Sequence, residues 1–160
     1  MKDSPTRRRQ SIRLGLVLLV AAGVSLGCDR LTGEVTGLKV GDCFDKPTDA
    51  NATVTDVQHQ PCSDPHDAEV IAVVVHDAPP SAGFPVVSGF SDFIQEKCVP
   101  VFATYIGRDF DTDTVFDLGY FQPTLTGWAG GDRGFTCYVS RSDAAKLTSS
   151  VRVGGATPTP

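Results

Sequence analysis

The sequence predicts an α+β domain, in which one main helix, at about residues 90–106, packs on a small antiparallel sheet and two disulfides staple the elements. Three observations predict this fold class. Segments typical of strands come before and after a single segment typical of a helix. Four cysteines are spread along these segments, and the order of strands, helix and strands favours antiparallel pairing.

The strand predictions before the helix rest on alternation and on β-branched residues. Residues 37–45 alternate apolar and polar side chains, and residues 51–59 form a candidate edge strand. Residues 68–76, AEVIAVVVH, are an almost unbroken apolar run, which fits a central strand buried on both faces. Residues 79–90 hold three prolines and two glycines, so we expect an irregular loop there.

The helix prediction rests on apolar residues at spacings of four and three, which gather on one helix face. These residues are Phe90, Ile94, Cys98, Val101 and Tyr105. Asp92 and Gln95 resemble a capping box, and Gly107 fits the position just past a helix end. Pro100 lacks an amide donor, which predicts a bend in the helix. After it, residues 114–123 and 133–141 predict two further strands.

The first 27 residues are typical of an export signal. Arginines precede an apolar stretch of 13 residues, Leu14–Leu26, which is shorter than the roughly 20 residues that span a bilayer. The stretch ends VSLGC, which resembles the lipobox of bacterial lipoproteins, with the leucine one position later than usual. The resemblance implies a diacylglyceryl thioether on Cys28 and cleavage before it. An uncleaved anchor helix is the alternative, and the arginines leave open a general secretory or a twin-arginine export route.

The chain therefore divides into four predicted segments. They are a lipoprotein signal peptide at 1–27, a tether at 28–36, the folded domain at 37–152 and a disordered tail at 153–160. The tether is short, so we expect the domain to work close to the membrane surface.

The cysteine count agrees with this division. Five cysteines are present, and lipid on Cys28 leaves an even number, with no C-x-x-C spacing. Cys98 lies on the apolar helix face and Cys137 lies within the last strand, so a Cys98–Cys137 bond would staple the helix to the sheet. Of three possible pairings we predict this one, with Cys43–Cys62 as the second disulfide.

The charge excludes one class of partner. The first 27 residues carry five of the 14 bases and one of the 19 acids, so the remainder has nine bases, 18 acids and a net charge of −9. Nucleic-acid binding depends on clustered bases that neutralise phosphates, so we expect no nucleic acid as a partner. Membrane contact is expected only through the lipid on Cys28.

The stretch CSDPHDAEV, residues 62–70, is the best candidate for a chemical site. His66 beside Asp67 could form an oriented imidazole, and with His59 and His76 it would form a zinc site if the fold brought the three together. Their spacing does not predict convergence, no G-x-S-x-G motif occurs within residues 37–152, and we expect no catalytic residue, metal or cofactor. The structural interpretation is a turn that launches a strand, with His66 and Asp67 bonded to turn amides.

Two further segments carry candidate metal-ligating or binding residues. Residues 109–120 carry aspartates at the first three ligand positions of a calcium loop but lack its glycine and its final glutamate, which favours a solvated acidic loop. The segment WAGGDRG is a candidate binding rim of Trp128, Asp132 and Arg133, with Phe84 as the other wall. The structural alternative is a packed indole together with an Asp-Arg pair that stabilises a turn.

These motifs together resemble the septum formation domain family of membrane-anchored extracytoplasmic proteins of actinobacteria. The matching segments are VGDCFD at 40–45, CSDPHDAEV at 62–70, FATYIG at 102–107, WAGGDRGFTC at 128–137 and the terminal LTSSVR. The resemblance covers about residues 38–152 and implies an association with division septa. It supplies no catalytic residue.

Three functional hypotheses follow. The first is a lipid-anchored, non-catalytic binding or interaction module on the extracytoplasmic face of the cell membrane, with envelope or division proteins as its partners. The second is a metal-dependent or hydrolytic envelope enzyme that uses His66 and Asp67. The third is a sensor domain for an envelope ligand.

Overall fold

The computed structural model describes residues 32–48, 53–85 and 87–154. The predicted signal peptide, the lipidation site Cys28, the first part of the tether and residues 155–160 of the tail lie outside the described residues. None of the helices in the described part of the chain has the length and apolar character needed to cross a bilayer.

The described strands form one antiparallel sheet of six strands in the order β1-β3-β2-β4-β6-β5. The strands span Thr32–Glu34 (β1), Cys43–Asp45 (β2), Asp56–Gln60 (β3), Ala68–Val75 (β4), Phe116–Phe121 (β5) and Gly134–Arg141 (β6). β4 and β6 are the longest, at eight residues each, and they pair along most of their length. The predicted antiparallel α+β fold is confirmed.

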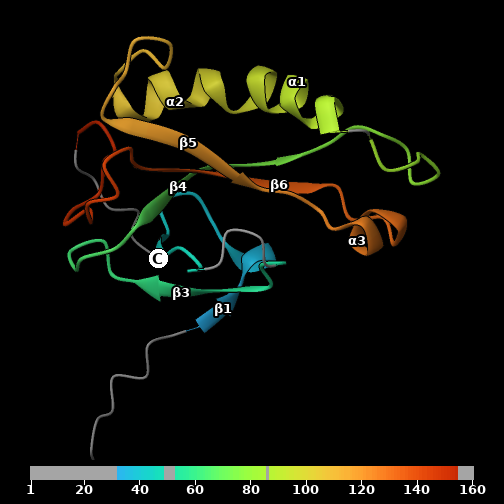
Figure 1. Ribbon diagram of the computed structural model, residues 1–160, viewed down its shortest axis with the longest axis horizontal. Coiled ribbons are helices and arrows are strands. Elements are labelled where there is room, and N and C mark those ends of the chain that lie inside the picture. The colour runs from blue at the N-terminus through green and yellow to red at the C-terminus, as the bar shows by residue number, and fades with distance from the viewer. Residues whose placement is uncertain (1–31, 49–52, 86, 155–160) are drawn as a thin grey trace, which may run out of the picture.

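Two helices, α1 (Val87–Lys97) and α2 (Val99–Ile106), follow one another over one face of the sheet (Figure 1). Their apolar residues pack against Phe135, Cys137 and Val139 of β6 in the main core. Side chains alternate along a strand, so the intervening residues of β6 point to the face without helices. The predicted packing of the helix on one sheet face is confirmed.

The face opposite α1 and α2 carries a second, smaller core. Its buried residues come from the 3₁₀ helix η1 (Val35–Gly37) and from the strands around it, and they are Val35, Leu38, Phe44, Val57, Ala68 and Val70. In Figure 1, η1, β1 and β3 lie on the side of β4 and β6 away from the helices. The first half of β4 therefore has a core on each face, as its apolar run predicted, whereas Val73 and Val75 are 47% and 71% exposed.

The helical segment differs in detail from the prediction. α1 begins at Val87, so Asp92 lies inside the helix and does not cap it. The helix is interrupted at Cys98, two residues before the expected bend. Pro100 then occupies the first turn of α2, where an amide has no helical partner and its loss costs no hydrogen bond. Gly107 ends α2 with a φ of 73°, in the left-handed region that favours glycine, as predicted.

Both predicted disulfides are confirmed. Cys98–Cys137 joins the break between α1 and α2 to β6, and both of its cysteines are fully buried. Cys43–Cys62 joins β2 to the turn before β4. The two bonds therefore hold different layers, since the first lies under the helices and the second beside the smaller core.

The predicted tether and tail are partly wrong. The predicted tether includes Thr32–Glu34, but these residues form the strand β1, which pairs with β3, and Val35 after them is buried. Because β1 pairs with the outer side of β3, β3 is not an edge strand, although the sequence predicted it as one. At the other end, the amide of Val153 donates to the carbonyl of Tyr105 at 2.8 Å, so the first residue of the predicted tail is bound to the domain.

Candidate functional site

His66 lies in the interior, just before β4, and is fully buried. Its backbone forms an isolated antiparallel bridge with Leu147, with hydrogen bonds of 3.0 and 2.8 Å. Its Nδ1 lies 2.7 Å from the carbonyl oxygen of Asp64, which can only accept, so Nδ1 carries the proton and donates. The other ring nitrogen, Nε2, is buried and has no hydrogen-bond partner among the described residues.

Asp67 points away from this interior and holds a loop. One carboxylate oxygen accepts from the amide of Lys46 at 3.0 Å, and the other lies 2.9 Å from the ammonium of Lys146. The pair links the end of β2 to the chain after β6. This geometry agrees with the structural interpretation of Asp67, since its charge is already engaged.

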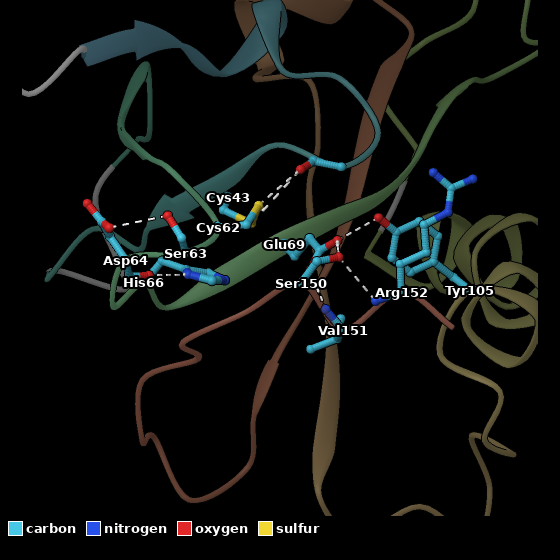
Figure 2. Close-up of a disulfide and its surroundings, with 11 residues drawn as sticks. Cys43, Cys62, Ser63, Asp64, His66, Glu69, Tyr105, Ser150, Val151 and Arg152 are labelled. Atoms are coloured by element: carbon cyan, nitrogen blue, oxygen red, sulfur yellow. Dashed lines mark hydrogen bonds between the residues drawn. A yellow bond between two sulfur atoms is a disulfide. The ribbon is translucent and has the colours of Figure 1, made fainter. Parts of the chain in front are cut away.

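Glu69 is the residue of this region that the sequence reasoning missed. It is fully buried within β4, where its carboxylate accepts three hydrogen bonds. The hydroxyls of Tyr105 and Ser150 donate at 2.6 and 2.7 Å, and the amide of Val151 donates at 2.7 Å (Figure 2). The signal was present in the sequence, because a glutamate within an apolar central strand must find buried partners.

The carboxylate also affects Tyr105. Burial, followed by the hydrogen bond to Glu69 and the charge of that carboxylate, raises the pKa of Tyr105 well above its usual value of 10. The guanidinium of Arg152 lies 5.3 Å from the centre of the Tyr105 ring. Through Tyr105, Ser150 and Val151, Glu69 ties α2 and the C-terminal segment to the sheet.

The Cys43–Cys62 disulfide lies beside these two buried groups. Within the described ranges, ligand atoms of Cys43, His66 and Glu69 all lie within 4.8 Å of one another, and all three residues are buried. Figure 2 shows the unbonded nitrogen of His66 on the side of the ring that faces Glu69. His59 and His76 are not part of this group, so the three-histidine site that the sequence left open is not formed.

Trp128 and Arg133 lie beside the end of β4 that is remote from His66. Both side chains are buried, so they do not form an exposed rim. The guanidinium of Arg133 stacks 3.8 Å above the Trp128 ring, and the indole N–H donates to the carbonyls of Ala82 and Gly83. Arg133 itself donates to five backbone carbonyls, of Ala78, Pro79, Pro80, Trp128 and Asp132. The two side chains therefore fix the 76–85 loop and the turn after α3 (Leu125–Ala129).

His76 belongs to the same end of the molecule. Its ring packs among aromatic rings, 4.6 Å from Phe93 and 5.3 Å from Trp128 between centroids. Its Nδ1 accepts from the amide of Ala78 at 3.0 Å, so it caps the start of the loop. Phe84, at the far end of that loop, contacts both Phe90 and Trp128 and keeps 36% of its surface exposed.

A groove with a volume of about 1070 Å³ lies on the sheet face without the long helices. Val73, Thr136 and Tyr138 line it from β4 and β6. Residues from β1 and β3, at one end of the strand order, and from the chain after β5, at the other end, also line it. The sheet is therefore curved toward this face.

Two of the six predicted binding residues, Phe84 and Asp132, line this groove. Trp128 and Arg133 support it from behind, whereas His66 and Asp67 do not take part. The charged residues of its lining are Glu34, Asp56, Asp132 and Lys46. Three of these four residues are acidic, so the groove presents more negative than positive charge.

The acidic loop after α2 is only partly solvated: Asp109 and Asp111 are exposed, as predicted, whereas the side chain of Asp113 is buried. Burial opposes ionisation of Asp113, but hydrogen bonds from the amides of Phe116 and Val115 and the contact with Arg108 lower its pKa below the usual value. Asp109 accepts from the amide and hydroxyl of Thr112. The loop thus uses its carboxylates to hold its own turn at the start of β5.

Comparison with known proteins gives one finding. A family model described as "Septum formation" matches residues 40–157, which include β2 to β6 and the C-terminal segment that binds Glu69. No curated protein and no solved structure matches the chain.

Proposed function

The chain belongs to the septum formation family, and from this premise we propose that it is a lipid-anchored binding module on the extracytoplasmic face of the cell membrane, without catalytic activity. Its partners in this proposal are proteins of the cell envelope or of division. The groove on the curved sheet face is the observation that supports the proposal most directly.

The groove has the character of a binding surface. It is broad, it is formed by rigid strands at its base, and aromatic residues such as Phe84 and Tyr120 lie at its rim with about a third of their surface exposed. Side chains of this type dominate binding energies at protein interfaces. The three carboxylates of the lining favour a partner segment that carries positive charge.

The rival enzyme hypothesis has less support. A general base must reach a substrate, whereas His66 is fully buried, and Asp67 is engaged with Lys146 and a backbone amide. The described cysteines are paired in disulfides, so no thiol nucleophile is available among them. The sensor hypothesis uses the same groove and differs only in its ligand.

Lipid anchoring rests on the sequence. The cysteine after the apolar stretch is followed by few residues before β1 begins at Thr32, so a lipid on Cys28 would hold the groove near the membrane. Mass spectrometry of the protein purified from membranes should find a chain that begins at Cys28 and carries the mass of the lipid, and Cys28→Ser should carry no lipid. A wild-type chain without the added mass would contradict the lipid anchor.

The groove itself is tested by a pair of substitutions on one strand. Val73 lines the groove and Val75 does not, although both are exposed and are two residues apart on β4. Proximity labelling from the membrane-anchored protein should lose its envelope or division neighbours with Val73→Arg and keep them with Val75→Arg. Identical labelled sets for both variants would refute the role of the groove.

Two measurements separate this proposal from the enzyme hypothesis. Elemental analysis of the purified, oxidised protein should find no stoichiometric metal. His66→Ala should keep the labelled neighbours of the wild type wherever the variant folds. Bound metal together with loss of function in this variant would favour the enzyme.

A further inference from the structure

The groove does not account for the buried group formed by the Cys43–Cys62 disulfide, His66 and Glu69. His66 Nε2 is buried without a partner among the described residues, and such an unpaired atom costs about 1–3 kcal/mol. Glu69 carries a carboxylate into the interior beside it, where three hydrogen bonds compensate for its burial. Packing therefore leaves the unpaired nitrogen of His66, beside a disulfide and a carboxylate, without an explanation.

We propose that Cys43, Cys62, His66 and Glu69 form a transition-metal site of the zinc type. The site cannot bind the metal while the disulfide is intact, and it becomes able to bind once the disulfide is reduced to two thiols. The donor set is two thiolates, one imidazole and one carboxylate, and these are the ligands that Zn²⁺ takes in four-coordinate sites. The inference is independent of the groove and of its partner.

The positions of the atoms support the assignment. Ligand atoms of Cys43, His66 and Glu69 lie within 4.8 Å of one another, and Cys62 is bonded to Cys43. The imidazole is already oriented for metal binding, because the hydrogen bond from Nδ1 to the carbonyl of Asp64 leaves Nε2 with a free electron pair. A carbonyl acceptor on the outer nitrogen is the usual support for a histidine that binds a metal.

Glu69 is held in the same way. Two hydroxyls donate to one of its oxygens, while the other oxygen accepts a single bond from the amide of Val151. A carboxylate oxygen with one donor retains an electron pair for a cation. The three donors thus hold the carboxylate in place and still leave one of its oxygens able to bind a cation.

The opening step is an ordinary thiol–disulfide exchange with a dithiol reductant. Cys62 is only partly buried, in the turn 61–65, whereas Cys43 is 2% exposed, so the reductant attacks Cys62 and Cys43 leaves as the thiolate. The second thiol of the reductant then releases Cys62, the reductant becomes a disulfide, and the protein gains two thiols. Binding of Zn²⁺ by both sulfurs releases two protons.

The test is a zinc titration of the purified full-length chain in a Cys28→Ala background, which removes the fifth cysteine from the count. A phosphine reduces the protein, and differential alkylation with mass spectrometry reports which disulfide has opened. The reduced Cys43–Cys62 form should bind one Zn²⁺ per chain, and the oxidised form should bind at least 100-fold more weakly. Equal binding by the two forms, or no binding after reduction, would overturn the proposal.

Variants assign the ligands. His66→Ala and Glu69→Gln should each weaken zinc binding at least tenfold, whereas His59→Ala, a histidine outside the group, should not change it. Because a reduced variant could unfold, X-ray absorption of the zinc-loaded wild type provides a second measurement. It should find two sulfurs at about 2.3 Å with nitrogen or oxygen ligands. Four sulfurs, or none, would overturn the assignment.

Discussion

Arg133 should be the side chain that contributes most to the position of the 76–85 loop. It is 7% exposed, it stacks on Trp128, and its guanidinium donates to the carbonyls of residues 78–80, 128 and 132. Arg133→Met keeps the volume of the stem but removes all of these donors. Arg133→Lys keeps the charge but cannot form the planar fork or the same stacking contact.

The magnitude follows from the acceptors that cannot reach water. The carbonyl of Trp128 is bonded to Arg133 at a buried position, while the loop carbonyls can be hydrated once the loop opens. A hydrogen bond from a charged donor contributes about 1.5–3 kcal/mol, and stacking on tryptophan adds about 1 kcal/mol, partly offset by the release of a buried charge. We expect Arg133→Met to lower the free energy of unfolding by about 3 kcal/mol and Arg133→Lys by about 2 kcal/mol.

Urea unfolding measures this directly, because Trp128 is the only tryptophan and lies under the guanidinium. Far-UV circular dichroism provides a second probe of the same transition. Arg141→Met is the matched control: Arg141 pairs with Asp143 at the surface, and its loss should leave the midpoint of urea unfolding close to that of the wild type. If Arg133→Met and Arg133→Lys both stay within about 0.5 kcal/mol of the wild type, the bracing role of Arg133 is refuted.

Three further predictions concern buried or cross-linking groups of the domain. Tyr105→Phe removes a buried hydrogen bond to Glu69 and should lower the free energy of unfolding in urea by about 2 kcal/mol at pH 7. Because the pKa of Tyr105 is raised in the fold, wild-type stability should also fall as the pH rises above 10, and it should fall less steeply in the variant. The pKa of Asp113 is lowered, so its contribution is present above about pH 4 and is lost as the pH falls further; Asp113→Asn should flatten the acid limb of thermal unfolding curves, and an unchanged limb would contradict this role. Replacing Cys98 and Cys137 by alanine opens a loop of 39 residues and should lower stability by about 4 kcal/mol, which calorimetry of the variant against the wild type would check.

Some of the fold followed from local patterns. The apolar run of β4, the helical spacing before Tyr105 and the glycine at 107 each carry their own physical cause, so the elements were predicted with small errors at their ends. The ends of the elements were predicted less accurately, because contacts with distant residues decide where a strand or helix begins. β1 is three residues long and polar at its exposed positions, and only its pairing with β3 makes it a strand.

The disulfides were predicted because only three pairings were possible and because each cysteine lay on an identifiable element. The candidate site was harder. The sequence grouped Trp128 and Arg133 but left both a binding rim and a packed indole open, because residue types do not reveal exposure; the burial of both side chains favours the packed indole. Phe84 and Asp132 reach the groove only because the 76–85 loop and the turn after α3 are held in place.

By itself the sequence determined the fold class, the central strand, the pairing of the cysteines and the resemblance that the family match confirms. These depend on local periodicity, on chain order and on residue type, which are written into short segments. Only the tertiary structure decided that His66 is buried with one unpaired nitrogen, that Glu69 lies beside it, and that both sheet edges curve around one groove. Such features arise from residues far apart in the chain, whose distances no local pattern encodes.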